Sequence, residues 1–152
     1  MKKLCMMASL VVIIVSMAAV AHADLDGFLQ SVNIQARTDM KNFNVKLSAQ
    51  FGVPVPQVEA IVRSVSAPAD AFMVLQLGQM TNKQPEVVLQ TYQRGKGKGW
   101  GALAKELGIK PGSAEFHALK RGDLSFTGEP GGGGGGGHGK GKGKGKGRGR
   151  NQ

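Results

Sequence analysis

The sequence has almost no cysteine: among its 152 residues only Cys5 carries a thiol. Cys5 lies in the first 23 residues, which we interpret below as a secretory leader. A mature chain that begins at Asp24 therefore has no disulfide and no thiolate metal site, although an oxidising compartment would allow the bridge. Its stability must come from packing.

Residue types that catalyse reactions are also scarce. After residue 23 the chain has two histidines, His117 and His138, and it has no GxSxG or HExxH motif. The acidic residues stand singly, outside the apolar settings that favour acid–base catalysis. His117 with Glu115 or Glu106 would supply two metal ligands, fewer than the three or four of a usual site. We therefore predict a protein that is not an enzyme and has no metal or cofactor.

The first 23 residues have the three parts of a secretory signal. A lysine pair follows Met1, an apolar run covers residues 10–20, and Ala-His-Ala at 21–23 is a small-x-small cleavage site. We expect cleavage before Asp24 and a periplasmic or secreted location in a bacterium. The alternative is an uncleaved anchor, because apolar residues extend over 4–21, close to the length that spans a membrane.

Residues 24–130 have the pattern of one helical domain. Apolar residues recur at helical spacing, Pro and Gly separate the segments, and no stretch alternates cleanly enough to predict a strand. The pattern predicts an all-α fold, a compact array of about six or seven short helices. The helix that opens at Pro68 is expected to be central, since residues 71–77 (AFMVLQL) are apolar almost all round.

Helix boundaries are expected at capping residues. Thr38 is predicted to cap the second helix, with Asp39 in its first turn and Met40 on its buried face. The fifth helix carries Val87, Val88, Leu89 and Tyr92. The remaining boundary residues are the helix-opening Pro56, Pro68 and Pro85, the cap Ser113, and the helix-ending Gly52, Gly95, Gly108 and Gly122.

Two segments resemble each other. LSAQFGVPVPQVEAIV (residues 47–62) and LAKELGIKPGSAEFHA (residues 103–118) align without a gap at an offset of 56. Each predicts a helix, a glycine stop and a tight corner into another helix. Duplication of a helix pair and convergence on the same corner chemistry both explain the match.

The segment GWGALAKELGIKPGSAEFHALKRG (residues 99–122) resembles a helix-turn-helix, which would make the chain a nucleic-acid binder. Export argues against this interpretation. A small residue and a glycine at this spacing also make an ordinary helix corner.

The segment QRGKGKGWG (residues 93–101) sets Arg94, Lys96 and Lys98 before an expected helix N-terminus. Free backbone N–H groups and the helix dipole favour an anion at such a place. The same sequence is typical of a solvated connector, and it lacks the glycine pattern of a nucleotide loop. These three residues are a candidate site for one anionic group.

Residues 131–152 contain nothing to bury, and glycine loses the most entropy on ordering, so this tail is predicted to be disordered. Residues 24–130 hold twelve Lys or Arg and ten Asp or Glu, a net charge of +2, whereas the tail holds six cations and no acidic residue. Seven glycines are followed by a cation at every second position. The cations are Lys140, Lys142, Lys144, Lys146, Arg148 and Arg150.

This pattern predicts polyanion binding by charge and counterion release, because the tail has no aromatic ring to stack on bases. The candidate partners are anionic lipid headgroups, lipopolysaccharide, acidic polysaccharide and extracellular nucleic acid. One alternative is a tail that only aids solubility. Another is a helical binding module that takes a protein or small ligand in a groove near Trp100, with an idle tail.

The segment GKGKGWGALAKELGIKPGSAEFHALKRG, with FGVPVPQVEAIV upstream, resembles a family of small exported bacterial proteins of uncharacterised function. The resemblance covers about residues 24–122 and is strongest around residues 99–120. It implies export and a helical body, and it assigns no catalytic residue.

Overall fold

The structure, a computed structural model, describes residues 23–129; the leader at 1–22 and everything from residue 130 on, including the six tail cations, lie outside the described part. The described residues form seven helices and no strand, which confirms the all-α prediction. In chain order the helices are α2 (Ala23–Thr38), α3 (Met40–Phe51), α4 (Val55–Ser64), α5 (Pro68–Thr81), α6 (Pro85–Arg94), α7 (Trp100–Glu106) and α8 (Ala114–Arg121).

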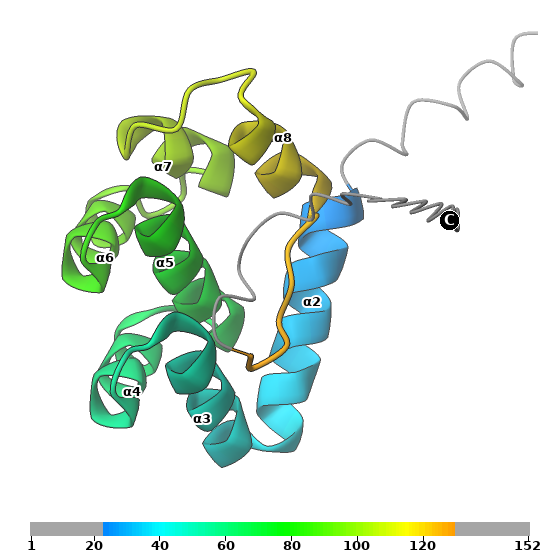
Figure 1. Cartoon of the computed structure of the whole chain (residues 1–152), viewed down its shortest axis with the longest axis vertical. Helices are drawn as coiled ribbons and strands as arrows, with labels where there is room; N and C mark the ends of the chain where they lie inside the picture. The colour runs from blue at the N-terminus through cyan, green and yellow to red at the C-terminus, as the bar shows by residue number, and fades with distance from the viewer. Residues whose placement is uncertain (1–22, 130–152) are drawn as a thin grey trace, which may run out of the picture.

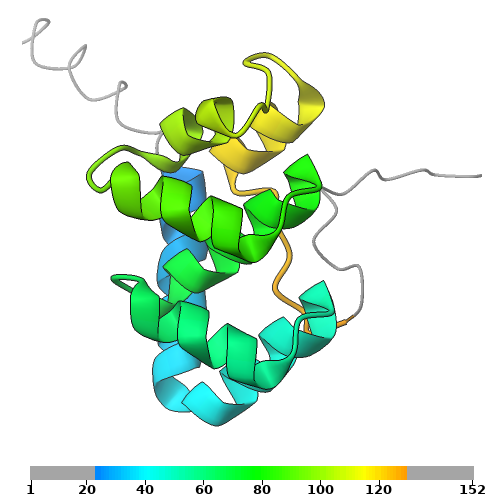
Figure 2. The same cartoon turned by 90° about the vertical axis from the view of Figure 1, so that its left-hand side faces the viewer.

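Helix α5 is the central helix, as its apolar sequence predicts. All residues from 71 to 78 are buried, because neighbouring helices cover α5 on every side. Figures 1 and 2 show the pairs α3–α4 and α5–α6 stacked one above the other beside the long helix α2, with α7 and α8 near the N-terminal end of α2. None of the helices between residues 23 and 121 combines the length and the apolar character needed to cross a bilayer.

A cluster of phenylalanine rings fills the core where α2, α3 and α5 meet. Phe72 of α5 lies at its centre, with ring centroids 5.2 Å from Phe28, 5.6 Å from Phe51 and 5.9 Å from Phe126. Phe43 lies 5.2 Å from Phe126. Tilted and edge-to-face pairs at these distances add to the stabilisation from burial, by about 0.5 to 1.5 kcal/mol each.

One predicted cap is wrong. The N-cap of α3 is Asp39, whose Oδ1 accepts a hydrogen bond from the Asn42 N–H at 2.9 Å. Thr38 ends α2 instead, and its hydroxyl donates to the Ile34 carbonyl at 2.9 Å. Aspartate succeeds here because its carboxylate both accepts the free N–H and suits the positive end of the helix.

Met40, predicted to lie on a buried face, is exposed, and so is Val87 of α6. Met40 is 40% exposed and Val87 is 45% exposed, because each lies in the first turn of its helix and faces away from the core. The other boundaries follow the sequence closely. Ser113 caps α8 by accepting from the Phe116 N–H at 3.2 Å, and Gly52 and Gly122 end their helices with φ of +66° and +68°.

Three corners between helices share one hydrogen-bond pattern, which the end of α8 repeats with the Asp123 N–H and the Ala118 carbonyl at 2.9 Å. After each helix end, an N–H donates to the carbonyl five residues earlier: Val53 to Ser48 at 3.2 Å, Lys83 to Gly78 at 2.9 Å, and Ile109 to Ala104 at 2.9 Å. This is the bond of a Schellman motif. The middle corner, between α5 and α6, was not predicted, because Asn82 with φ +52° takes the place of the glycine.

The repeat between residues 47–62 and 103–118 holds for the first helix and the corner only. In the gapless alignment, the buried Val58 and Ile61 face the exposed Ala114 and His117. The buried residues of α8 are Phe116 and Leu119, each two positions later. The connection between α7 and α8, residues 107–113, is also longer than the connection between α3 and α4, residues 52–54.

After α8 the chain does not form another helix. Residues 123–129, which we call the strap, run as an extended segment back along α2 to α3 (Figure 1). Exposure alternates along the strap: Leu124, Phe126 and Gly128 are partly buried, and the residues between them are exposed. An extended chain on a surface shows this period of two.

Candidate functional site

The candidate anion loop lies between α6 and α7. Arg94 is the last residue of α6, and Lys96 and Lys98 follow on an exposed turn closed by the Lys98 N–H donating to the Gly95 carbonyl at 2.8 Å. Gly95 itself is buried: a Cβ atom there would lie 2.6 Å from Cδ2 of Leu103. The glycine is thus required by close packing of the loop against α7.

Only part of the positive charge of this loop is unpaired. The Lys98 Nζ lies 3.4 Å from Oε2 of Glu106, and both side chains are more than 40% exposed. Such a surface pair is worth about 0 to 1 kcal/mol. Helix α7 also spans only Trp100–Glu106, so few aligned peptide groups contribute to its dipole. The structure places the three cations at the end of α6 and on the exposed turn that follows it.

The origin of the tail is fixed on a different part of the molecule. The strap ends at Glu129 beside α3, where the ring of Phe126 packs against Phe43 and lies under the Lys46 ammonium, 5.8 Å from the ring centroid. In both Figures 1 and 2 this end of the strap lies away from the loop between α6 and α7. The loop that carries Arg94, Lys96 and Lys98 and the last described residue before the tail, Glu129, therefore lie at different places on the body.

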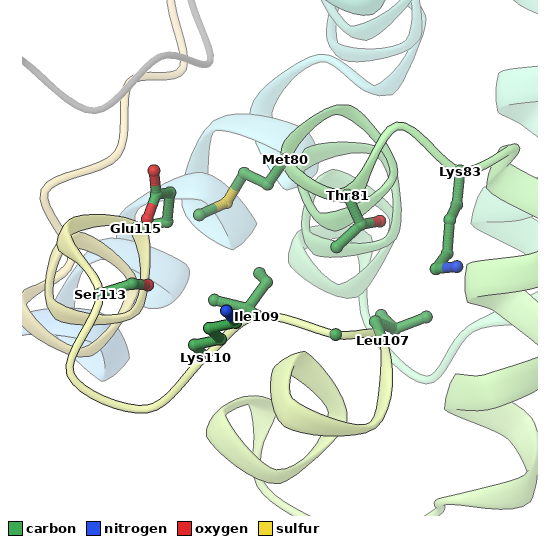
Figure 3. Close-up of a pocket in the computed structure, with 9 residues that line it drawn as sticks. Met80, Thr81, Lys83, Leu107, Ile109, Lys110, Ser113 and Glu115 are labelled. Carbon is green, nitrogen blue, oxygen red and sulfur yellow. The ribbon is translucent and has the colours of Figure 1, made fainter.

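A cavity of about 400 Å³ lies between the end of α5 and the corner that joins α7 to α8 (Figure 3). Lys83 and Glu115 lie on opposite sides of it. The Glu115 pKa is lowered by a hydrogen bond from its own backbone N–H and by the Ser113 hydroxyl. The residues that line the cavity are Met80, Thr81, Lys83, Leu107, Gly108, Ile109, Lys110, Ser113 and Glu115.

The lining of the cavity contains no histidine and no cysteine, and its one carboxylate, Glu115, is hydrogen-bonded to the Ser113 hydroxyl. Between residues 23 and 129, no group of three or more His, Cys, Asp or Glu side chains comes together to hold a metal ion.

Trp100 serves to pack α7 onto α6. Its ring stacks on Tyr92 with centroids 5.4 Å apart and planes at 15°. The Tyr92 hydroxyl in turn donates to Oδ2 of Asp70 at 2.8 Å, which ties α6 to the start of α5. Trp100 does not line the 400 Å³ cavity, so the groove predicted near it is not that cavity.

The resemblance of residues 99–122 to a helix-turn-helix is limited by the connection. The segment from Leu107 to Ser113 joins α7 to α8, and it is longer than the three or four residues of the DNA-binding turn. Phe116 and Leu119 face the core, which leaves His117 and Lys120 on the exposed side of α8.

Gln50 is a residue of importance that sequence analysis missed. It is only 1% exposed, and its side-chain amide binds three backbone groups of the strap. A glutamine on an amphipathic helix carries no sign of partners that lie more than seventy residues away in sequence. The one available signal was the short alternation of Leu124, Phe126 and Gly128.

Comparison with known proteins adds no identification. No family model matches the chain, and no curated protein or solved structure is significantly similar to it. Any functional argument must therefore come from the residues of the chain itself.

Proposed function

We propose that this chain is an exported, non-enzymatic helical protein that associates with anionic polymers or membrane surfaces through its C-terminal cations. The observation that carries the proposal is the separation of charge along the sequence. Six cations lie in residues 131–152 with no acidic residue among them, whereas residues 24–130 are nearly neutral. Each Lys or Arg near an anionic surface contributes about 1 kcal/mol.

The strap supports this proposal, because it gives the tail a defined starting point. Gln50 and the phenylalanine cluster hold residues 124–128 on the body, up to the exposed Glu129. The cations then begin eleven residues further on, at Lys140. A polyanion bound by the tail would thus be tethered close to α3.

The loop cations have a secondary role in the proposal. Arg94 and Lys96 are exposed and form no ion pair with another described residue, but Lys98 shares its charge with Glu106. Two unpaired cations on one loop form a weaker site than the six tail cations, which occupy every second position of residues 140–150. Binding should therefore depend mainly on the tail.

Retention of three forms on heparin and on anionic vesicles, measured across a salt series, tests the proposal. The forms are the mature chain, a chain without residues 131–152, and a full-length chain in which Gln replaces all six tail cations. We expect the mature chain alone to bind strongly and to elute as salt rises, since counterion release makes binding salt-dependent. The Gln-substituted form keeps the tail length, so it isolates the charge.

Zwitterionic vesicles serve as the control surface and should retain none of the three forms. Equal retention of all three forms on the anionic surface, without dependence on salt, would contradict the proposal. Salt-dependent retention of the truncated and Gln-substituted forms that equals retention of the mature chain would point instead to the helical body.

A further inference from the structure

The strap lies in a groove that recognises its backbone. The Gln50 Nε2 donates to the Ser125 carbonyl at 2.7 Å, and its Oε1 accepts from the N–H groups of Thr127 at 3.0 Å and Gly128 at 3.1 Å. One buried amide thus binds three main-chain groups of the strap, one carbonyl and two successive N–H groups. None of these bonds depends on the side chains of Ser125 or Thr127, which point to solvent.

The groove also selects side chains at alternate positions. Leu124 packs on the core, and the Phe126 ring enters the cluster of Phe43 and Phe72. At Gly128 a Cβ atom would lie 2.8 Å from Cγ of Lys46, and φ is +77°, so only glycine fits without strain. The groove therefore favours a peptide with Leu, Phe and Gly at alternate positions, the pattern Leu-x-Phe-x-Gly.

Main-chain hydrogen bonds combined with pockets at alternate positions are how proteins bind extended peptides. We propose that the groove between α2, α3 and α5 is a peptide-binding site. Within one chain its own strap fills the groove, and in a dimer the strap of a second copy takes its place. Every copy of the protein carries the sequence that the groove recognises, so a second copy is the occupant that the structure itself specifies. The inference does not depend on the proposed function of the tail.

The connection to α8 suits such an exchange. The strap departs from Gly122, whose φ of +68° marks a turn. Its first residue, Asp123, is held to α8 by its N–H, which donates to the Ala118 carbonyl at 2.9 Å, and by an exposed ion pair with Arg121. Residues 124–129 of the strap form no hydrogen bond or ion pair with α8. An exposed ion pair resists opening weakly. The strong contacts of the strap are with α3 and α5, and a second copy offers the same contacts. Exchange of an identical segment is a low-cost route to a dimer.

Within one chain the strap has the advantage of a high effective concentration, in the millimolar range for a short tether. Exchange is therefore best seen when the two halves of the site are separated. An acceptor, Phe126→Ala, keeps the groove and loses its own ring. A donor, Gln50→Leu, keeps the strap and loses the groove amide. Both are made in the full mature chain.

We expect the acceptor and the donor to be monomers when each is alone and to form a one-to-one complex when mixed, doubling the mass seen by analytical ultracentrifugation. High salt in all samples screens repulsion between the two tails. A mixture that stays monomeric at millimolar concentration, with both variants folded by circular dichroism, overturns the proposal. A complex that forms equally between two acceptor chains also overturns it, because neither has a ring to donate.

A synthetic peptide of residues 122–129 provides the second measurement. It should bind the acceptor and not the wild-type chain, and a peptide with Phe126→Ala should bind at least about a hundredfold more weakly, given what removal of a buried ring usually costs. If the acceptor fails to fold, Phe126→Leu retains part of the packing and replaces it in both experiments. Equal binding of the two peptides would show that the groove does not select the ring.

Discussion

The body (residues 24–130) and the tail (residues 131–152) of this protein differ in their charge and in their apolar content. Residues 24–130 carry an almost balanced set of charges and an apolar core in which α5 is buried along most of its length. Residues 131–152 carry cations and glycines and no acidic or large apolar residue. The same residue type also has different roles in the two regions, since glycines end helices in the body and separate cations in the tail.

This difference implies that stability and binding can be changed independently. Substitutions of uncharged residues in the body or strap should change the free energy of unfolding and leave the affinity for polyanions unchanged. Substitutions of the tail cations should do the opposite.

Phe126→Ala should lower the free energy of unfolding by about 3 kcal/mol, because it removes a ring from the core cluster and leaves space beside Phe43 and Phe72. Denaturant unfolding at low protein concentration measures this. Salt-dependent retention on heparin should not change. Ser125→Ala is the matched control in the strap, since its side chain is exposed, and it should stay within about 0.5 kcal/mol of wild type.

Gln50→Leu should cost about 2 to 3 kcal/mol of unfolding free energy. The leucine is of similar size, but three backbone groups of the strap lose their partner. Hydrogen exchange should then speed up at the amides of Thr127 and Gly128. The control is Gln90→Leu at an exposed position of α6, which should change neither measurement. Unchanged exchange in the strap after Gln50→Leu would mean that this amide does not hold it.

Gly52→Ala should lower the unfolding free energy by about 1 kcal/mol, because φ is +66° at this helix end and an alanine is strained there. Gly134→Ala, in the tail, should change it by nothing measurable. A thermal melt of both variants beside wild type makes the comparison. A loss of stability in the tail variant would contradict the division between body and tail.

Lys96→Gln should weaken retention on an anionic surface by less than about 1 kcal/mol, and Lys98→Gln should weaken it less still. The reason for the order is that Lys98 already lies 3.4 Å from Glu106, so its charge is partly compensated. Elution salt from heparin, measured with the tail intact, compares the two. Equality of Lys98→Gln with the six-fold tail substitution would place the main site on the loop.

Most of the helical architecture could be predicted from the sequence, because the residues that begin and end the helices act locally. Proline opens α5 and α6, and Gly52, Gly108 and Gly122 lie at helix ends. The errors arose where two local choices compete. Thr38 and Asp39 are both good caps, and only the path of the chain between α2 and α3 decides that the aspartate takes this role.

The strap and its hydrogen bonds to Gln50 could not be predicted, because they depend on contacts between distant residues. Leu124, Phe126 and Gly128 alternate over too short a stretch to signal an extended segment. Gln50 looks like an ordinary polar residue of α3 until the fold brings Ser125 to it. Likewise, sequence alone grouped Arg94, Lys96 and Lys98, but it gave no sign that Glu106 would compensate one of them.

Export is the premise on which the proposed partners rest. The most direct test is to fractionate cells that express the full chain and to determine, by mass spectrometry, the N-terminus of the protein in each fraction. The account predicts a chain that begins at Asp24, found outside the cytoplasm and released from the envelope by salt. An intact chain that begins at Met1 in the cytosol would contradict it.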